Sequence, residues 1–473
     1  MRDFLTGKKH IHMIGIGGSG MYPLAQILHA KGYYLTGSDN NETDTLAAVR
    51  AMGIPVQLGQ RAENLGDADL VVYSAAIAKT NPERAAAEAS GVEMAERSEL
   101  LGLISEWYSE AVCIAGTHGK TTVTSMLTQI LLTAGVDLSA VIGGKLPSLG
   151  GSGKSGSSDV FVCEACEYVD TFLKLSPDIS VILNIDEDHM EYFKTLDNLK
   201  ASFAKFAQKA SRFVIYNGDD LNSCAAVRGV KGKKMIRFGM GADCEWRAAD
   251  VRHTAEGRTE FSVYYEGMLL GTAAILVPGE HNVLNALAAI ASAHCVGLNF
   301  EQCTAGLLEF HGAKRRFDIH ARVGGITVAD DYGHHPAEIA ATLRAAKAMP
   351  FARVIAVHQP FTYTRTARLL DDFAAALSIA DIVALTDIMG GREENTVGVF
   401  TRQLAEKIEG CIWFPQDETV PWTDERKYRN FDDVCRAVCE AAQPGDLIIT
   451  LGCGDVNKLS KQIAETLQKK AET

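Results

Sequence analysis

Residues 111–134, AVCIAGTHGKTTVTSMLTQILLTA, combine an apolar strand, a glycine-containing turn and the start of a helix. A loop of this kind binds phosphate through its backbone N–H groups and the N-terminus of the following helix. The complete phosphate-loop pattern places a glycine where this chain has Ile114, so the loop is a shortened variant. Lys120 can reach the β- and γ-phosphates of a nucleotide, and Thr121 can place its hydroxyl on Mg²⁺. The stretch therefore predicts a nucleotide-binding α/β domain.

A second glycine loop lies near the beginning of the chain. Gly15, Gly17 and Gly20 fit G-x-G-x-x-G after a predicted strand, and Asp39 follows the next strand. On these residues alone, a site for NAD(P), a site for another nucleotide and a purely structural turn all remain open. Because a dehydrogenase needs only one nucleotide loop, the presence of two argues against that class.

Strand and helix patterns alternate in three series along the 473 residues. At ~150 residues per domain, this length predicts about three domains. The boundaries divide the chain into residues 1–107, 108–314 and 315–473. Alternating strands and helices indicate an α/β fold with mostly parallel sheets in each part.

Three segments of the middle part depart from this alternation. Residues 244–277 read as antiparallel hairpins, with turns at Glu256-Gly257 and Glu266-Gly267. An alanine-rich helix is expected at about 281–296. The Gly/Ser-rich stretch 148–158 predicts a mobile surface loop.

Composition excludes several classes of protein. The net charge of −13 argues against a nucleic-acid partner, because proteins that bind nucleic acids neutralise phosphate charge. Neither a signal peptide nor the ~18 uninterrupted apolar residues of a membrane helix is present, so we expect a cytoplasmic protein. Its eleven cysteines are then free thiols. Cys163 and Cys166 have C-x-x-C spacing, but the sequence has no second C-x-x-C pair that would complete a zinc site.

Carboxylates follow two predicted strands of the middle part. Glu164 ends the strand at 159–165, and Asp188 and His189 follow the strand at 179–185. Ligands of open α/β sheets bind outside the carboxyl ends of the strands, so Glu164 and His189 are candidate Mg²⁺ ligands beside the phosphate loop. A solvated acid and a packed histidine are the alternatives.

Eight segments, considered together, resemble the Mur ligase family. In chain order they are HMIGIGGSGM, GTHGKTT, NIDEDHMEYF, GEHNVLNALAAIA, KRRFD, DDYGHHPAEI, YTRT and LGCGD. The resemblance implies an N-terminal Rossmann-like domain for a UDP-sugar, a central ATPase domain and a C-terminal Rossmann-like domain. It spans nearly the whole chain, so it is far more specific than either glycine loop.

The resemblance also implies a reaction of the cytoplasmic stage of peptidoglycan precursor synthesis. ATP would activate the lactyl carboxylate of UDP-N-acetylmuramate as an acyl phosphate, and the amine of L-alanine would then displace phosphate. A ligase that attaches a recycled murein tripeptide to the same UDP-sugar is the alternative, and a nucleotide sensor without catalysis is a third hypothesis. The oligomeric state, monomer or homodimer, is left open.

The site residues implied by the resemblance fall into four groups. Those for catalysis are Lys120, Glu164, His189, Asn285, Arg316 and Asp331. Those for ATP are Gly116, Thr117, His118, Gly119, Lys120, Thr121, Thr122, His281, Asn282, Arg316 and Asp331. Those for Mg²⁺ are Thr121, Glu164 and His189. Gly15, Gly17, Gly18, Ser19, Asp39, Ser74 and Arg97 are implied for the UDP-sugar, and Tyr332, His334, His335 and Arg365 for the amino acid.

Some of these assignments have competitors. Arg315 competes with Arg316, and one asparagine of the 281–296 helix could serve only as its cap. His334 and His335 could be turn histidines before Pro336, which suits the first turn of a helix. Many members of the family carry histidine and arginine where this chain has Phe361 and Thr362. Arg365 is therefore expected to hold the amino-acid carboxylate alone or with help from elsewhere.

Overall fold

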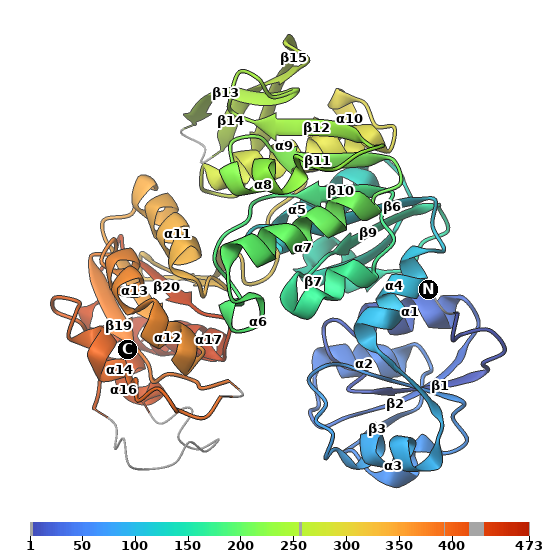
Figure 1. Ribbon diagram of the computed structural model, residues 1–473. Coiled ribbons are helices and arrows are strands. Elements are labelled where there is room, and N and C mark those ends of the chain that lie inside the picture. The colour runs from blue at the N-terminus through green and yellow to red at the C-terminus, as the bar shows by residue number, and fades with distance from the viewer. Residues whose placement is uncertain (1–2, 255–257, 392, 416–429, 473) are drawn as a thin grey trace. The chain divides into compact units, whose positions relative to one another are not determined.

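The computed structural model describes residues 3–254, 258–391, 393–415 and 430–472. The chain forms two compact units, which are described separately. The first contains Met1–Thr254, Arg258–Leu276 and Val283–Ala313, and the second contains Val277–Asn282 and Lys314–Thr473. The first unit holds two sheets and the second holds one, all with helices on both faces, as the α/β prediction requires (Figure 1). The predicted domain boundaries near 107 and 315 stay predictions.

The N-terminal sheet of the first unit has five parallel strands in the order β3-β2-β1-β4-β5. Its apolar runs are buried on both faces, as expected for parallel strands. Helices α1 (Tyr22–Ala30) and α2 (Asp44–Ala51) contribute to the core on one face, and α3 (Pro82–Ser90) packs on the other. The strands are β1 (His10–Ile14), β2 (Tyr34–Asp39), β3 (Val56–Leu58), β4 (Leu70–Tyr73) and β5 (Glu93–Glu96).

The central sheet of the first unit has ten strands in the order β15-β14-β13-β12-β11-β10-β6-β9-β7-β8. Helix α7 (Leu196–Lys209) belongs to the core on one face, whereas α5 (Lys120–Thr133) packs on the other face beside α9 (His281–Cys295) and α10 (Phe300–Leu308) (Figure 1). The parallel strands are β6 (Glu110–Ala115), β7 (Ser139–Leu146), β9 (Val160–Glu164), β10 (Ile179–Ile182), β11 (Phe213–Asn217) and β12 (Lys234–Gly239).

The predicted antiparallel hairpins are confirmed at one end of this sheet. Strands β13 (Trp246–His253), β14 (Thr259–Tyr265) and β15 (Met268–Ile275) pair antiparallel. The predicted turn at Glu266-Gly267 joins β14 to β15, and both residues have positive φ, 48° and 82°. The other predicted turn, Glu256-Gly257, lies outside the described residues.

The prediction of a mobile loop at residues 148–158 is wrong. This stretch contains β8 (Gly151–Lys154), a largely buried edge strand that pairs antiparallel with β7. A Cβ on Gly153 would lie 2.4 Å from Cβ of Pro23 in α1, and the hydroxyl of Ser152 donates to the carbonyl of Ser19 at 2.9 Å. The glycines that suggest a loop instead allow close packing between a strand and a helix.

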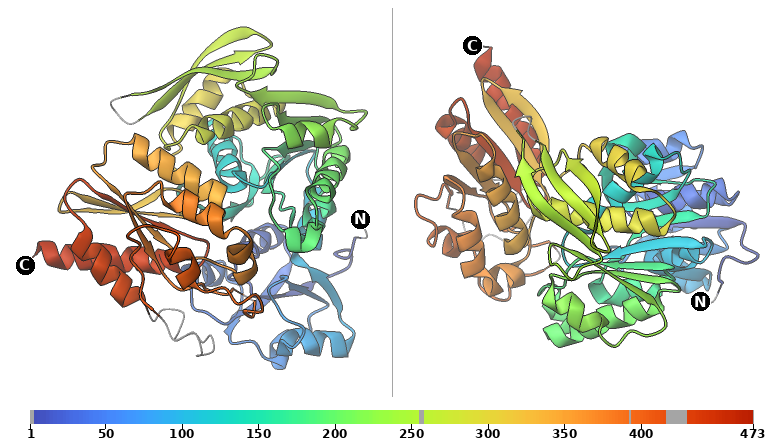
Figure 2. Two further views of the ribbon diagram at one scale, coloured as in Figure 1. Left: turned by 60° about the vertical axis from the view of Figure 1, so that its left-hand side comes forward. Right: turned by 90° about the horizontal axis from the view of Figure 1, so that it is seen from above.

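The sheet of the second unit has the order β16-β17-β20-β18-β19. Its strands are parallel except for β16, which forms a hairpin with β17. Helices α11 (Pro336–Ala348), α13 (Leu370–Leu377) and α14 (Thr401–Ala405) cover one face, and α16 (Phe431–Ala441) and α17 (Val456–Ala471) cover the other (Figure 2). The strands are β16 (Asp318–Val323), β17 (Ile326–Asp331), β18 (Val354–His358), β19 (Ile382–Leu385) and β20 (Leu447–Leu451).

Two expectations drawn from composition can be compared with the structure. All eleven cysteines are free thiols, as predicted. Among the described helices, none has both the length and the apolar character needed to span a membrane.

Candidate nucleotide and metal site

The predicted phosphate loop forms the turn between β6 and α5. Gly116 and Gly119 have positive φ, 150° and 86°. A Cβ on Gly116 would lie 2.9 Å from the Cβ of Leu183, and a Cβ on Gly119 would lie 2.7 Å from Oδ1 of Asn285. Only glycine fits at these two positions without displacing its neighbours. Asn285, predicted from the motif on α9, therefore lies directly against the loop.

The segment after β10 holds the loop in place. The N–H of His118 donates to Oδ1 of Asn184 at 2.8 Å, and Nδ2 of Asn184 donates back to the His118 carbonyl at 3.1 Å. The N–H of Asp186 donates to the hydroxyl of Thr117 at 2.9 Å. These bonds preorganise the loop. The N-cap of α5 is Gly119, which has no side chain to hydrogen-bond with the N–H groups at the helix N-terminus, the groups that bind anions. Thr121 and Thr122 follow Lys120 in the first turn of α5.

Lys120 is engaged by a residue that the sequence analysis missed. Its ammonium donates to Oε2 and Oε1 of Glu167 at 2.9 and 3.1 Å, to the carbonyl of Thr117 at 3.1 Å and to that of Gly116. Burial by itself would lower the pKa of Lys120, but Glu167, with smaller effects from Cys166 and Glu164, raises it well above its usual value. The lysine therefore stays charged. The only sign of Glu167 in the sequence is an acid three positions after Glu164.

Glu164 lies at the end of β9, beside Ile114 of β6 in the sheet register. Its Oε1 accepts a hydrogen bond from the N–H of Gly143 at 2.6 Å, and a Cβ on Gly143 would lie 2.5 Å from Oε2. The carboxylate is thus held at the carboxyl edge of the sheet, close enough to Lys120 to affect its pKa. The prediction that Glu164 and the phosphate loop share this edge is confirmed.

His189 lies in a strained turn after β10. Its φ of 55° is in the left-handed region, and it begins the short helix α6 (Met190–Phe193). Its imidazole lies 3.6 Å from Oδ2 of Asp188 and 3.5 Å from Oε1 of Glu191. Such strain is concentrated at functional sites.

The chemistry of the donors fits Mg²⁺ in part. Mg²⁺ prefers oxygen ligands, which Thr121 and Glu164 offer. The imidazole of His189 is a less usual ligand for this ion, but the carboxylate of Asp188 lies beside it.

The N-terminal glycine loop brings together several residues predicted to bind the UDP-sugar. The N–H of Gly17 donates to Oδ2 of Asp39 at 3.1 Å, and a Cβ on Gly20 would lie 3.3 Å from the guanidinium of Arg97. The N–H of Gly18 donates to the Gly15 carbonyl at 3.0 Å, which closes the turn before Ser19. The hydroxyl of Ser74 accepts from the N–H of Ala76 at 3.3 Å, at the end of β4. Asp39 braces the loop from the neighbouring strand.

In the second unit, the two adjacent arginines differ in their contacts. Arg315 donates from Nε to the buried carboxylate of Asp330 at 2.9 Å and from Nη2 to the carbonyl of Gly452 at 2.6 Å. The guanidinium of Arg316 lies 5.1 Å from the ring centre of Tyr332. These bonds give Arg315 a structural task, and its guanidinium also lies 4.9 Å from the same ring centre.

Asp331 ends β17 and is buried. Its two carboxylate oxygens accept hydrogen bonds from the N–H groups of Phe317 and Gly333, both at 2.8 Å. Burial raises the pKa of the Asp331 carboxyl, although Arg316 and these two N–H groups oppose the shift. A buried acid with a perturbed pKa at a strand end is a candidate functional group.

Three of the residues predicted for the amino acid, Tyr332, His334 and His335, come directly before α11. His335 is the N-cap of this helix and Pro336 its first residue, as the turn interpretation expects. The carboxylate of Glu338 accepts from the N–H groups of His334 and His335 at 3.0 and 3.3 Å, and the rings of Tyr332 and His334 lie 5.6 Å apart. Sequence analysis missed this role of Glu338.

Arg365 lies on α12 (Tyr363–Arg368), near the thiol of Cys453 that follows β20. Burial raises the pKa of Cys453 to about 12, and the positive charge of Arg365 opposes the shift. The LGCGD segment therefore belongs to the same part of the second unit as Arg365, although no residue of that segment was predicted to line a site.

His281 and Asn282 lie at the beginning of α9. Nδ2 of Asn282 donates to the carbonyl of Pro278 at 2.6 Å, and a Cβ on Gly279 would lie 2.5 Å from the His281 ring. Asn282 thus closes the turn before the helix, which agrees with a local structural role.

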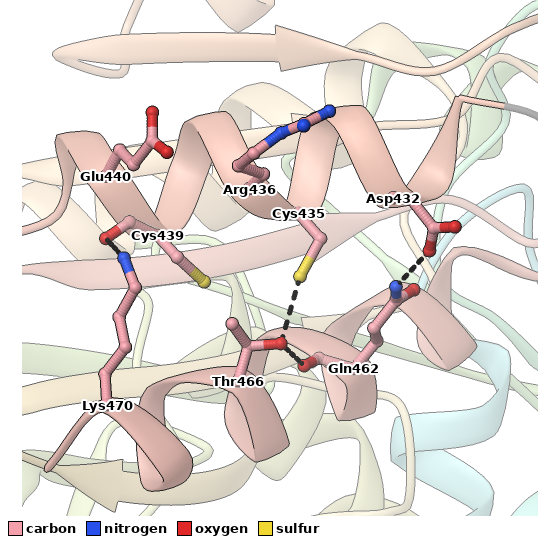
Figure 3. Close-up of a pocket in the computed structure, with 8 residues that line it drawn as sticks. All are labelled: Asp432, Cys435, Arg436, Cys439, Glu440, Gln462, Thr466 and Lys470. Carbon is pink, nitrogen blue, oxygen red and sulfur yellow. Dashed lines mark hydrogen bonds between the residues drawn. The ribbon is translucent and has the colours of Figure 1, made fainter. Parts of the chain in front are cut away.

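A separate cavity lies between α16 and α17 (Figure 3). The thiols of Cys435 and Cys439 lie one helical turn apart at this cavity, and Sγ of Cys435 is 3.5 Å from the hydroxyl of Thr466. These two helices cover the face of the sheet opposite to α11. None of the residues predicted from the motifs lines this cavity.

Three family models match the chain in succession. They are described as "Mur ligase family, catalytic domain" at residues 10–108, "Mur ligase middle domain" at 114–293 and "Mur ligase, glutamate ligase domain" at 315–454. Together they cover most of the chain in the order expected from the motifs.

Curated relatives match over nearly the full length. The UDP-N-acetylmuramate–L-alanine ligases of Caldanaerobacter subterraneus and Agathobacter rectalis are 40% and 41% identical, each over 98% of both chains. A crystal structure of UDP-N-acetylmuramate–alanine ligase from Thermotoga maritima has a TM-score of 0.80 and 26% identity, over 98% of this chain and 100% of that one. A murein peptide ligase from Psychrobacter arcticus has a TM-score of 0.73 and 25% identity, over 97% and 99%.

Proposed function

The chain belongs to the Mur ligase family, and we propose that it is an ATP-dependent ligase that joins L-alanine to the lactyl carboxylate of UDP-N-acetylmuramate in the cytoplasm. The observation that carries this proposal is the full-length similarity, about 40% identity, to ligases of that name. The Lys120 loop and Glu164, both at the carboxyl edge of the central sheet, support it.

The chemistry follows from the groups that react. A carboxylate is a poor electrophile, because its negative charge repels a nucleophile and its oxygen could leave only as oxide or, after protonation, as hydroxide. Transfer of the γ-phosphoryl group of ATP to the carboxylate oxygen breaks the bond to ADP and yields an acyl phosphate. The amine of L-alanine then attacks the acyl carbon, the amide bond forms, and phosphate leaves with the bonding electron pair while the amine loses a proton. This route needs no covalent enzyme nucleophile, so catalysis consists mainly of positioning and charge neutralisation.

The first unit would hold the phosphates. The N–H groups at the start of α5 and the ammonium of Lys120 neutralise their negative charge. Thr121, Glu164 and His189 would hold Mg²⁺, which screens the phosphate charge when bound. Asn285 lies against the loop, where it can support Gly119 or contact the nucleotide.

The remaining roles are proposed from the family motifs. Arg316 and Asp331 would act on the ATP phosphates and the reacting groups. Tyr332, His334, His335 and Arg365 would bind L-alanine. Gly15, Gly17, Gly18, Ser19, Asp39, Ser74 and Arg97 would bind the UDP-sugar, and His281 and Asn282 the nucleotide.

The alternative is a ligase that attaches a murein tripeptide to the same UDP-sugar. The Psychrobacter arcticus structure has the same fold at 25% identity. The curated relatives at about 40% identity are alanine ligases, so the alternative has less support.

Phosphate release by the purified protein tests the proposal. With ATP, Mg²⁺ and UDP-N-acetylmuramate present, we expect release to depend on L-alanine and to fall at least about a hundredfold in Lys120→Met. If no phosphate were released with any added amine although ATP still bound, the sensor hypothesis would replace this one.

A further inference from the structure

The ion pair between Lys120 and Glu167 indicates a residue that sets the behaviour of the phosphate loop. Both carboxylate oxygens of Glu167 accept from the same ammonium, at 2.9 and 3.1 Å, and the Glu167 side chain is only 1% exposed. We propose that Glu167 is a positioning residue, which holds Lys120 at the base of the loop and releases it to nucleotide phosphates only when a divalent cation accompanies them. This inference rests on the proposed ATP-dependent ligation.

The N–H donors of Lys120 are all directed to protein atoms. The ammonium has three N–H groups, and these are directed to Glu167 and to the carbonyls of Gly116 and Thr117. A phosphate oxygen must therefore compete with a fully buried carboxylate for the same donors. Such a charge-assisted pair is geometrically specific and costly to break without replacement.

The backbone after Glu167 is held in place by several contacts. Val169 and Asp170 have positive φ, 52° and 58°. The carboxylate of Asp170 accepts from the hydroxyl of Tyr192 at 2.8 Å and from that of Ser202. The ring of Tyr168 lies 4.7 Å from that of His189. The strained turn therefore ties Glu167 to the segment that carries His189.

Charge explains the expected dependence on a cation. Glu167 lies three residues after Glu164, and both carboxylates act on Lys120. Two carboxylates repel a polyphosphate that arrives without a counterion, whereas a bound cation cancels the repulsion. Removal of the Glu167 charge should therefore strengthen the binding of metal-free ATP. The same change should also release Lys120 from its fixed position.

The test uses the full-length protein and the variants Glu167→Gln and Glu167→Asp. Calorimetry in EDTA measures the Kd for metal-free ATP, with no UDP-sugar or amine present. We expect Glu167→Gln to bind metal-free ATP at least about threefold more tightly than wild type, and its kcat with Mg²⁺ to fall about tenfold or more. Glu167→Asp keeps the charge but shortens the side chain, so its metal-free Kd should equal that of wild type while its kcat falls.

Asp371→Asn is the matched control, because it removes an acid from a surface pair with Lys407 at 2.7 Å. Its metal-free Kd and kcat should both match wild type. The inference would be overturned if Glu167→Gln bound metal-free ATP no more tightly than wild type. It would also be overturned if Glu167→Asp bound metal-free ATP as tightly as Glu167→Gln does. If Glu167→Gln does not fold, Glu167→Asp alone still decides the inference. Tighter binding of metal-free ATP by Glu167→Asp would overturn it. An unchanged Kd for metal-free ATP together with a reduced kcat would support it.

The binding arm also separates this inference from the proposed function. It requires neither L-alanine nor UDP-N-acetylmuramate, so it gives a result even if wild-type protein fails to release phosphate. That failure would overturn the proposed ligation, whereas the comparison of metal-free Kd values would still decide the role of Glu167.

Discussion

The N–H of Gly143 on β7 donates a 2.6 Å hydrogen bond to Oε1 of Glu164 at the end of β9. This bond joins two neighbouring strands of the central sheet at the edge where the phosphate loop begins. It orients a carboxylate that otherwise has several rotamers, and it leaves Oε2 for a ligand. The proposed Mg²⁺ ligand is therefore positioned by a glycine on another strand.

Gly143→Ala should disturb this arrangement. The added Cβ would lie 2.5–2.9 Å from the atoms of the Glu164 carboxyl group, so the side chain must move. A displacement of about 1 Å in a catalytic group can cost on the order of a hundredfold, and we expect kcat to fall at least about tenfold, with a higher Mg²⁺ requirement. Initial rates at several Mg²⁺ concentrations measure both. Gly229→Ala, at an open position, is the control, and equal rates in the two variants would contradict this role of Gly143.

Gly153→Ala tests the packing of β8 on α1. The new Cβ would lie 2.4 Å from Cβ of Pro23 and 2.9 Å from the carbonyl of Ala140. Overpacking of this kind destabilises proteins by about 1–3 kcal/mol, so the melting temperature should fall by several degrees. Thermal unfolding, monitored by circular dichroism, gives the melting temperatures of Gly153→Ala and of the control Gly229→Ala. No difference between them would mean that residues 151–154 do not pack as a strand.

His358 should make stability depend on pH. Burial on β18 lowers the pKa of His358 to about 4, although its hydrogen bond to the Leu451 carbonyl opposes the shift. In the unfolded chain His358 binds a proton below pH ~6.5, whereas in the folded chain it does so only near pH 4. The contribution of His358 to the free energy of unfolding is therefore fully present above pH ~6.5 and is lost as the pH falls toward 4. The full effect is about 3 kcal/mol, from the linkage of about 1.4 kcal/mol per pKa unit.

Urea denaturation between pH 7 and pH 4.5 measures this loss. In His358→Asn, where the amide can still donate to Leu451, the decline in unfolding free energy over that range should be smaller than in wild type. His311→Gln, at an exposed site, should keep the wild-type slope. The same slope in His358→Asn and wild type would contradict the assignment of a buried neutral histidine.

Arg365→Ala tests the proposed contact with the carboxylate of the amino acid. Loss of a charge-assisted hydrogen bond costs about 1.5–3 kcal/mol, which raises the KM for L-alanine by about 10- to 150-fold. The KM values for ATP and for UDP-N-acetylmuramate should change little. Arg368→Ala, on the exposed last turn of the same helix, is the control. A uniform rise in all three KM values would instead indicate a structural role for Arg365.

The sequence predicts those parts of the site that depend on local pattern. Glycines before a helix predict the phosphate loop, and acids at the ends of strands predict Glu164, because parallel strands end at one edge of the sheet. The loop prediction for residues 148–158 failed because the burial of β8 depends on α1, more than a hundred residues earlier in the chain. Glu167 was missed because its contact with Lys120 joins residues 47 positions apart, and no local pattern indicates such a tertiary contact.

The central claim is the identity of the amine, and a competition experiment tests it most directly. Wild-type protein receives ATP, Mg²⁺ and UDP-N-acetylmuramate with equal concentrations of L-alanine, glycine, L-serine and the tripeptide L-Ala-γ-D-Glu-meso-diaminopimelate, and mass spectrometry resolves the amide products. The proposed function predicts that the L-alanine adduct predominates. A predominant tripeptide adduct would contradict it and favour the alternative ligase, and a predominant glycine or serine adduct would show that Phe361 and Thr362 accompany a different amino-acid specificity.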